Sequence, residues 1–179
     1  MNQKNTTTIM TEKETPLLLN DYIDSLPIPS VELDKTSSHI ITTYGFDNLP
    51  IDTVNEIYKD GRVFSHFIEN WLATNYSLIH IKGCKDHDFI DPNNREIIYD
   101  QKTFTSGGCK FMPSSMIGTG RTFKKEEFEK KANKLIYCVV SNILFPVIKI
   151  RFVRGSTLIK TYPTGVIPFK QHDILFNTT

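Results

Sequence analysis

The sequence predicts an α/β fold in which a mixed central β-sheet is flanked by helices. Apolar residues recur at three- and four-residue spacing between Val54 and Leu72, which is the period of an amphipathic helix. Short runs that are apolar or rich in β-branched residues lie at 78–82, 96–105, 136–140 and 147–153, as in strands. The charged segment 124–135 reads as a helix that divides these strands into two groups. With a further strand in a hairpin beginning at Phe89, the expected order is α-β-β-β-α-β, followed by one last strand.

Local signals place the boundaries of the early elements. Asp52 or Thr53 can cap the first main helix, and Gly61 is a point where that helix is expected to be interrupted. Pro92-Asn93-Asn94 supplies the backbone angles of a turn, so the strand from Phe89 should fold back onto the strand at 96–105. A short helix is expected at 17–26, before the Pro27-Ile28-Pro29 break.

Length and composition predict a single domain. The chain has 179 residues, of which 39% are hydrophobic, enough for one well-formed core. Residues 1–15 are polar and should form a flexible tail, leaving one domain over 16–179. No apolar run approaches the roughly 18 residues of a membrane span, and no apolar leader begins the chain, so we expect no membrane association. Three widely spaced cysteines favour reduced thiols and a cytoplasmic location.

The net charge of +1 hides a division of the chain into an acidic and a basic half. Residues 1–100 carry 8 Lys and Arg against 16 Asp and Glu, whereas residues 101–179 carry 13 against 4. A basic half beside an acidic cluster suits a metal-dependent enzyme that acts on a polyanion, because cations hold phosphates and carboxylates hold the metal. The alternative is that the charges interleave in three dimensions and cancel.

Asp100-Gln101-Lys102 closes an apolar strand, and Asp88 precedes it across the predicted turn. Side chains two residues apart on a strand share a face, so Asp100 and Lys102 should emerge together, roughly 6–7 Å apart along the strand. Folding the hairpin back brings Asp88 beside Asp100. Two carboxylates and a lysine form an oxygen-lined site that suits Mg²⁺, with a group that can position or activate water next to it.

The same residues have a plainer interpretation. Asp88, Asp100 and Lys102 could be surface charges of a hairpin, paired with Arg95 or Lys85. Asp86, Asp91 and Glu96 could replace Asp88 as a ligand, although Asp91 and Glu96 border the turn and are more easily explained as turn-stabilising or solvated groups. A second acid-x-lysine triplet, Glu129-Lys130-Lys131, lies on the second predicted helix and is interpreted as a solvated face.

With these residues and this order of elements, the chain resembles the PD-(D/E)xK nuclease superfamily and, within it, the type II restriction endonucleases. The resemblance covers roughly Asp52 to Val153. It implies a restriction-endonuclease-like core, Mg²⁺ held by Asp88, Asp100 and the backbone carbonyl of Gln101, and Lys102 as the catalytic lysine. Glu69, on the preceding helix, matches a glutamate that some members place near the site. Two departures are His87 in place of the proline before the first acid, and Asp instead of Glu as the second acid.

A DNA-binding surface is expected beside this site. The polar segment 106–121 is too long for a simple connector, and its glycines would let backbone amides approach phosphates while Arg or Lys reaches base edges. A lid-like loop is the alternative. Lys149 and Arg151 share one face of the last strand and could extend the basic surface. The candidate DNA contacts are Lys110, Ser114, Ser115, Thr119, Arg121, Lys149 and Arg151.

The expected function is therefore that of a Mg²⁺-dependent endonuclease that hydrolyses phosphodiester bonds of double-stranded DNA. The family resemblance implies a homodimer acting at a short palindromic sequence. Two alternatives stay open: a structure-specific or nicking DNA nuclease such as a junction resolvase, and a nucleic-acid-binding module without catalysis. Cleavage of plasmid DNA with Mg²⁺ would separate these three.

Overall fold

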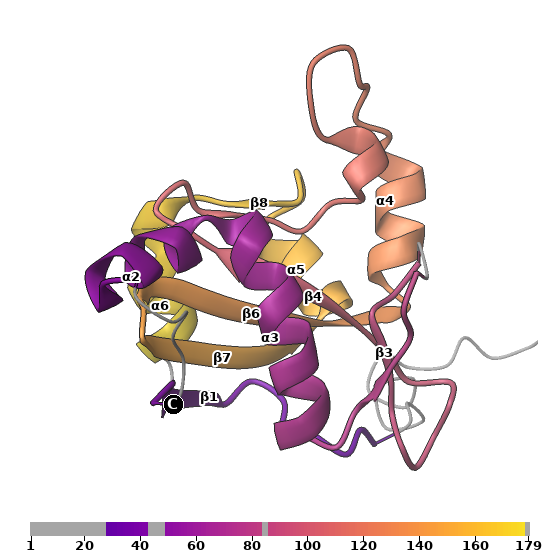
Figure 1. Cartoon of the computed structure of the whole chain (residues 1–179). Coiled ribbons are helices and arrows are strands. Elements are labelled where there is room, and N and C mark those ends of the chain that lie inside the picture. Colours follow the sequence, from indigo (N-terminus) through magenta and orange to yellow (C-terminus); the bar gives the residue numbers. More distant parts are fainter. Residues whose placement is uncertain (1–27, 43–48, 84–85, 178–179) are drawn as a thin grey trace, which may run out of the picture.

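A six-stranded sheet with the strand order β1-β7-β6-β4-β3-β2 organises the chain (Figure 1). A computed structural model describes residues 28–42, 49–83 and 86–177; the expected tail at 1–15 and short helix at 17–26 lie outside this range. Strands β5 and β8 pair in a separate two-stranded sheet. The strands are β1 Thr36–Ile40, β2 Ile79–His80, β3 Phe89–Ile90, β4 Ile98–Phe104, β5 Cys109–Lys110, β6 Leu135–Leu144, β7 Val147–Arg154 and β8 Val166–Ile167. The helices are α2 Ile51–Lys59, α3 Gly61–Asn75, α4 Lys125–Ala132, α5 Gly155–Thr161 and α6 His172–Asn177, with 3₁₀ turns η1 Ser114–Met116 and η2 Phe169–Gln171.

The sheet is mixed, as the sequence predicts. Strands β2, β3 and β4 form an antiparallel meander, and the chain then crosses through α4 to β6, which runs parallel to β4. A parallel neighbour requires such a crossover, because a tight turn can only join antiparallel strands. β7 returns antiparallel to β6, and β1 completes the sheet at the edge of β7. Within the described ranges, no helix is both long enough and apolar enough to cross a bilayer.

Two hydrophobic cores cover the two faces of this sheet. α2 and α3 cross one face in Figure 1, and α5 and α6 lie behind the other. The side chains of β6 are apolar on both faces of the sheet. One set packs in the core under α2 and α3: Ile136, Cys138 and Val140. The alternate set packs in the second core: Leu135, Tyr137 and Val139. This alternation follows from the two-residue period of a strand. β6 is therefore the central strand, buried from both sides.

The first main helix of the sequence is two helices in the structure. Asp60 caps α3 by accepting a hydrogen bond from the Arg62 amide at 2.8 Å, and the chain bends between α2 and α3. The next residue, Gly61, lies so close to the sheet that a Cβ there would approach Thr105 Cγ2 at 2.9 Å. The expected cap at Asp52 or Thr53 is wrong, because Pro50 occupies the N-cap of α2 and provides no side-chain hydrogen bond.

The segment 106–121 is less polar in the structure than its composition suggests. Cys109, Phe111, Met112 and Met116 are buried in the second core, and β5 pairs with β8 near the C-terminus. The longest exposed stretch of this segment is the tip from Gly118 to Arg121, on an arm that rises above α4 (Figure 1). The prediction of one long polar loop is therefore wrong, because isolated apolar residues with no regular period become buried through tertiary contacts.

Asp91 stabilises the hairpin that carries the acidic residues. Its carboxylate is completely buried and accepts hydrogen bonds from the Tyr99 hydroxyl at 2.5 Å, the Ser30 amide at 2.7 Å and the Asn93 amide at 2.9 Å. Burial alone would raise its pKa, but the Tyr99 and Ser30 hydrogen bonds lower the pKa of Asp91 to about 2. Its role in the turn is thus confirmed, and the hydrogen bonds fix how β3 meets β4.

Candidate functional site

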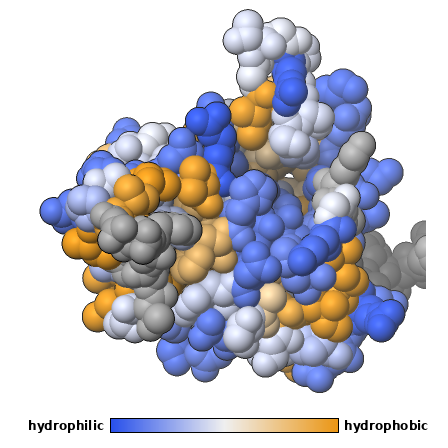
Figure 2. Space-filling model, viewed as in Figure 1, coloured by the Kyte–Doolittle hydropathy of each residue, from blue (hydrophilic) through white to orange (hydrophobic). Residues whose placement is uncertain are grey.

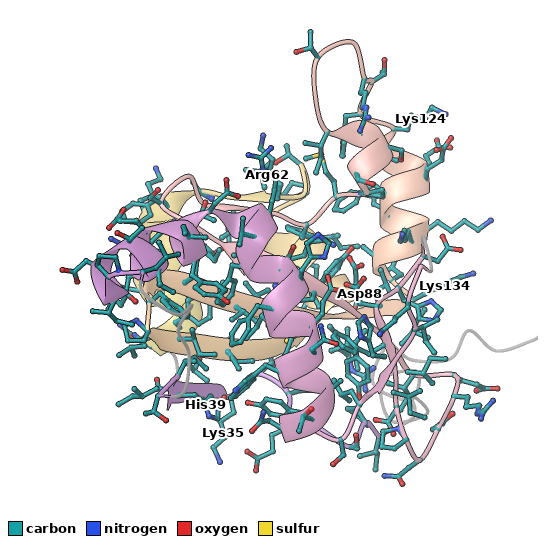
Figure 3. The ribbon with its side chains drawn as sticks, in the orientation of Figure 1. Lys35, His39, Arg62, Asp88, Lys124 and Lys134 are labelled. Carbon is teal, nitrogen blue, oxygen red and sulfur yellow. The ribbon has the colours of Figure 1, made fainter. Side chains whose placement is uncertain are left out.

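Asp88 and Asp100 come together across the β3–β4 hairpin. Asp88 directly precedes β3, and the register that pairs Phe89 with Tyr99 brings it across from Asp100 on β4. The Asp88 amide donates to the Tyr99 carbonyl at 2.8 Å, and Asp88 Oδ2 accepts from the Gln101 amide at 2.6 Å. The backbone of β4 therefore holds one oxygen of Asp88 in place. Figure 3 shows Asp88 between α3 and α4.

Lys102 completes the expected triplet on the same face of β4 as Asp100. Its Nζ lies 2.5 Å from Asp100 Oδ2 and donates to the Gln101 carbonyl at 3.0 Å. Only 22% of the lysine side chain is exposed, and 13% of the Asp100 side chain. This limited exposure argues against solvated hairpin charges, and Lys85, one of the partners expected in that alternative, lies outside the described residues.

The neighbouring carboxylate of Asp100 makes Asp88 harder to ionise. Burial raises the pKa of Asp88, the neighbouring Asp100 raises it further, and together they bring it to about 6, against smaller lowering effects from the Gln101 amide and Lys102. A pair of half-buried acids with one partner lysine has more negative charge than its protein neighbours compensate. Such a site favours an added cation.

A cleft of about 660 Å³ opens above these residues. Its floor holds Asp88, Asp100 and Lys102, and one wall is the η1 turn from Pro113 to Met116. The other wall is α4, where Glu127 and Lys131, one helical turn apart, face inward. Figure 2 shows hydrophilic surface in the middle of the molecule, below the arm that α4 supports. The cleft therefore joins acids of the first half of the chain to lysines of the second.

Lys131 departs from its expected solvated position. Its Nζ lies 3.8 Å from Asp86 Oδ1 across the mouth of the cleft, and its side chain is 25% exposed. Of the other two members of the triplet, Glu129 lies as expected on the outside of α4, 3.7 Å from Lys125, and Lys130 is exposed. α4 thus presents a cation to the site. The sequence alone could not predict this, because it does not show which face of α4 points to β4.

Glu69 lies near the site on α3, held by His80. The two side chains are 3.4 Å apart, between α3 and β2. Its charge also raises the pKa of Asp88, as the last and smallest of the effects on that group. Glu69 therefore belongs to the electrostatic surroundings of the acids, while His80 is a partner that the sequence did not indicate.

The oxygen donors fit Mg²⁺ better than a transition metal. No group of three or more His, Cys, Asp or Glu side chains gathers in the described part of the chain in a way that could hold a metal ion. Magnesium does not need one, because it is commonly held by one or two carboxylates while water and substrate phosphate complete its shell. Asp88, Asp100 and the Gln101 carbonyl are such donors; the Gln101 side chain instead bonds Thr103 Oγ1 at 3.0 Å.

The candidate DNA contacts separate into two groups. Ser114 and Ser115 line the cleft itself, and Thr119 and Arg121 lie on the exposed arm above it, where Arg121 donates to the Ser114 carbonyl. Lys110 is exposed on β5. Within this group, Ser114 and Ser115 are the residues that share the cleft with the two acids.

Lys149 and Arg151 form the second group, on β7 beneath the C-terminal helix. Lys149 Nζ donates to Asn177 Oδ1 at 2.9 Å, and Arg151 donates to the Leu175 carbonyl at 2.7 Å. Asp34 approaches Arg151 at 4.0 Å. Both side chains therefore hold the end of α6 against the sheet, and these contacts favour a structural role for them.

A second constellation with catalytic residue types lies elsewhere. Ser141 Oγ is 3.0 Å from His172 Nε2, and His172 Nδ1 is 3.0 Å from Asp173 Oδ1. Ser141 is only 3% exposed in the middle of β6, so its hydroxyl cannot reach a substrate carbonyl. The chain of hydrogen bonds attaches α6 to β6.

Comparison of the sequence and structure with protein-family models, curated proteins and solved structures found no match.

Proposed function

We propose that the chain is a Mg²⁺-dependent endonuclease of the PD-(D/E)xK type that hydrolyses phosphodiester bonds in DNA. The observation that carries the proposal is the meeting of Asp88, Asp100 and Lys102 in one cleft, at the strand positions where that nuclease family has its two acids and lysine. The antiparallel meander β2-β3-β4 after α3, and the crossover through α4 to parallel β6, also agree with the order of elements in such enzymes.

Each group in the cleft has a separate role in the proposed reaction. Mg²⁺ bound by Asp88, Asp100 and the Gln101 carbonyl would neutralise charge on the phosphate oxygens and make a water more acidic. Lys102 can donate a hydrogen bond to the attacking water or to the scissile phosphate, because its Nζ is already held at the floor of the cleft by Asp100 and the Gln101 carbonyl. Lys131 and the η1 serines line the walls, where they can bind the adjacent phosphate oxygens.

Supercoiled plasmid DNA provides the test of the activity. Incubation with Mg²⁺ should convert the plasmid to nicked or linear products, EDTA should prevent this, and Ca²⁺ should support binding with little cleavage. Discrete fragments would favour a sequence-specific restriction enzyme, and a single nick would favour the structure-specific alternative. If the plasmid stays intact at every Mg²⁺ concentration while DNA is bound, the non-catalytic binding module is the correct function.

The family resemblance also implies a homodimer for restriction-type cleavage at a palindrome. We propose this state together with the sequence-specific activity, since it rests on the family resemblance. Light scattering of the protein with and without a DNA duplex measures it directly. A monomer on DNA that still nicks the plasmid would favour the nicking nuclease.

A further inference from the structure

A second pocket, of about 520 Å³, adjoins the catalytic cleft. The two cavities share Asp86, Glu127 and Lys131, so a chain that lies in one can continue into the other. Ile98 and Leu135 form part of the lining, and Lys130, Lys134 and His87 complete it. Ile98 precedes Asp100 by two residues on the same face of β4, roughly 6–7 Å along the strand. The pocket therefore begins one nucleotide's length from the acids.

The lysines of this pocket come from one face of α4 and the turn that ends it. Glu127, Lys130, Lys131 and Lys134 are spaced by three and four residues, which places them on one helical face. Lys131 is paired with Asp86, and Glu127 with Lys124 at 2.9 Å. Lys130 and Lys134 are exposed and form no ion pair with the described acidic residues. Figure 3 shows Lys134 near the C-terminal end of α4.

An apolar surface beneath unpaired lysines matches the two parts of a nucleotide. A base can lie against Ile98 and Leu135 without needing specific hydrogen bonds, while its phosphate is bound by ammonium groups. A base that remains stacked in an intact duplex is not available to such a pocket, because it is covered by its neighbours and paired. A pocket of this kind could therefore take up an unpaired nucleotide but not a paired one.

We propose that this pocket binds one unpaired nucleotide of the DNA strand next to the scissile phosphate. The base lies on Ile98 and Leu135, and the phosphate is held by Lys130 and Lys134. The inference rests on the proposed nuclease function and specifies its substrate: DNA that contains a bulge, gap or flap beside the cleavage position is preferred over a perfect duplex. This places the enzyme closer to a structure-specific nuclease than to a restriction enzyme.

The test compares two fluorescein-labelled duplexes of the same length, one perfect and one with a single unpaired thymidine, by anisotropy in Ca²⁺ at fixed salt. The wild-type protein should bind the bulged duplex about tenfold more tightly, which is the lower end of the effect of a base stacked on an aromatic ring, because Ile98 and Leu135 offer apolar contact without a ring. The double variant Lys130→Ala/Lys134→Ala should lose most of this preference. Lys125→Ala is the matched control, because it removes an exposed lysine of α4 outside the pocket and should retain the preference.

Equal wild-type affinity for both duplexes would overturn the proposal, as would an unchanged preference in the double variant. Thymidine 5′-monophosphate serves as a competitor: displacement of the bulged duplex at micromolar concentration would mean that the pocket takes a free nucleotide, and would overturn the assignment to a DNA strand. Plasmid cleavage in Mg²⁺ is measured on the same preparations. Cleavage without the preference rejects only the pocket, whereas the preference without cleavage rejects only the nuclease function.

Discussion

Asp88 Oδ2 accepts a hydrogen bond from the backbone amide of Gln101 at 2.6 Å, and this contact joins the two acids of the site through the strand itself. Asp100 is the residue before that amide and Lys102 the residue after it. The position of Asp88 relative to both is thus fixed by the pairing of β3 with β4 rather than by flexible side chains alone. A shift of one residue in that pairing would turn Asp88 to the other face of the sheet.

The first prediction concerns how much the ionised Asp88 carboxylate destabilises the folded protein. Asp88 has its pKa raised to about 6, above the usual value of an aspartate, so its ionisation destabilises the folded protein above pH 6 and has no effect below about pH 4. Asp88→Asn should therefore raise stability at pH 8 in EDTA by about 1 to 3 kcal/mol, and the gain should disappear as the pH falls through 6 toward 4. Urea denaturation at pH 4, 6 and 8 measures this; a loss of stability at pH 8 would contradict it.

The opposite sign is expected at Asp91. Its pKa is lowered to about 2, so the charged carboxylate stabilises the fold above about pH 4, and this contribution is lost as the pH falls through 2. Asp91→Asn should destabilise the protein at pH 7 by about 2 to 3 kcal/mol, because the Tyr99, Ser30 and Asn93 donors lose a charged acceptor. Thermal denaturation at pH 7, with the exposed Glu96→Gln as control, tests this. A melting temperature equal to that of the control would refute the buried hydrogen-bond network.

A third prediction tests whether Arg151 has a structural role or binds DNA. Arg151→Ala should lower stability by about 1 to 2 kcal/mol, because its guanidinium donates to the Leu175 carbonyl at the end of α6. The salt dependence of DNA binding should stay the same. A decrease of about one in the slope of log affinity against log salt, at unchanged melting temperature, would instead make Arg151 a phosphate contact.

A fourth prediction concerns Gly155, where α5 meets α4. A Cβ at this position would lie 2.0 Å from the Ala132 carbonyl oxygen and 3.0 Å from Tyr137 Cε2. Gly155→Ala should therefore cost on the order of 2 kcal/mol or more, since neither the backbone of α4 nor the buried ring can yield freely. Denaturant unfolding measures the change. Wild-type stability would mean that α5 is free to move away from α4.

Features that depend on a local sequence pattern could be predicted from the sequence. The amphipathic period of 54–72, the long β-branched runs that became β6 and β7, and the placement of Asp100 and Lys102 on one face all follow from neighbours in the chain. Tertiary contacts decided the rest. β1 has no strong pattern of its own and forms by pairing with β7, and Lys131 enters the site only because α4 packs that face toward the hairpin. Phe111 and Met116 are buried by contacts distant in sequence.

Cleavage of supercoiled plasmid in Mg²⁺ by three single variants tests the central claim most directly. Asp100→Asn and Lys102→Ala each remove one charge from the site without removing a packing residue, and each should lower the rate on the order of 10³-fold. Glu96→Gln removes an exposed carboxylate of the same hairpin and should cleave at the wild-type rate. Circular dichroism of each variant checks that it is folded. Wild-type rates for Asp100→Asn or Lys102→Ala would contradict the assignment of this cleft as the active site of a nuclease.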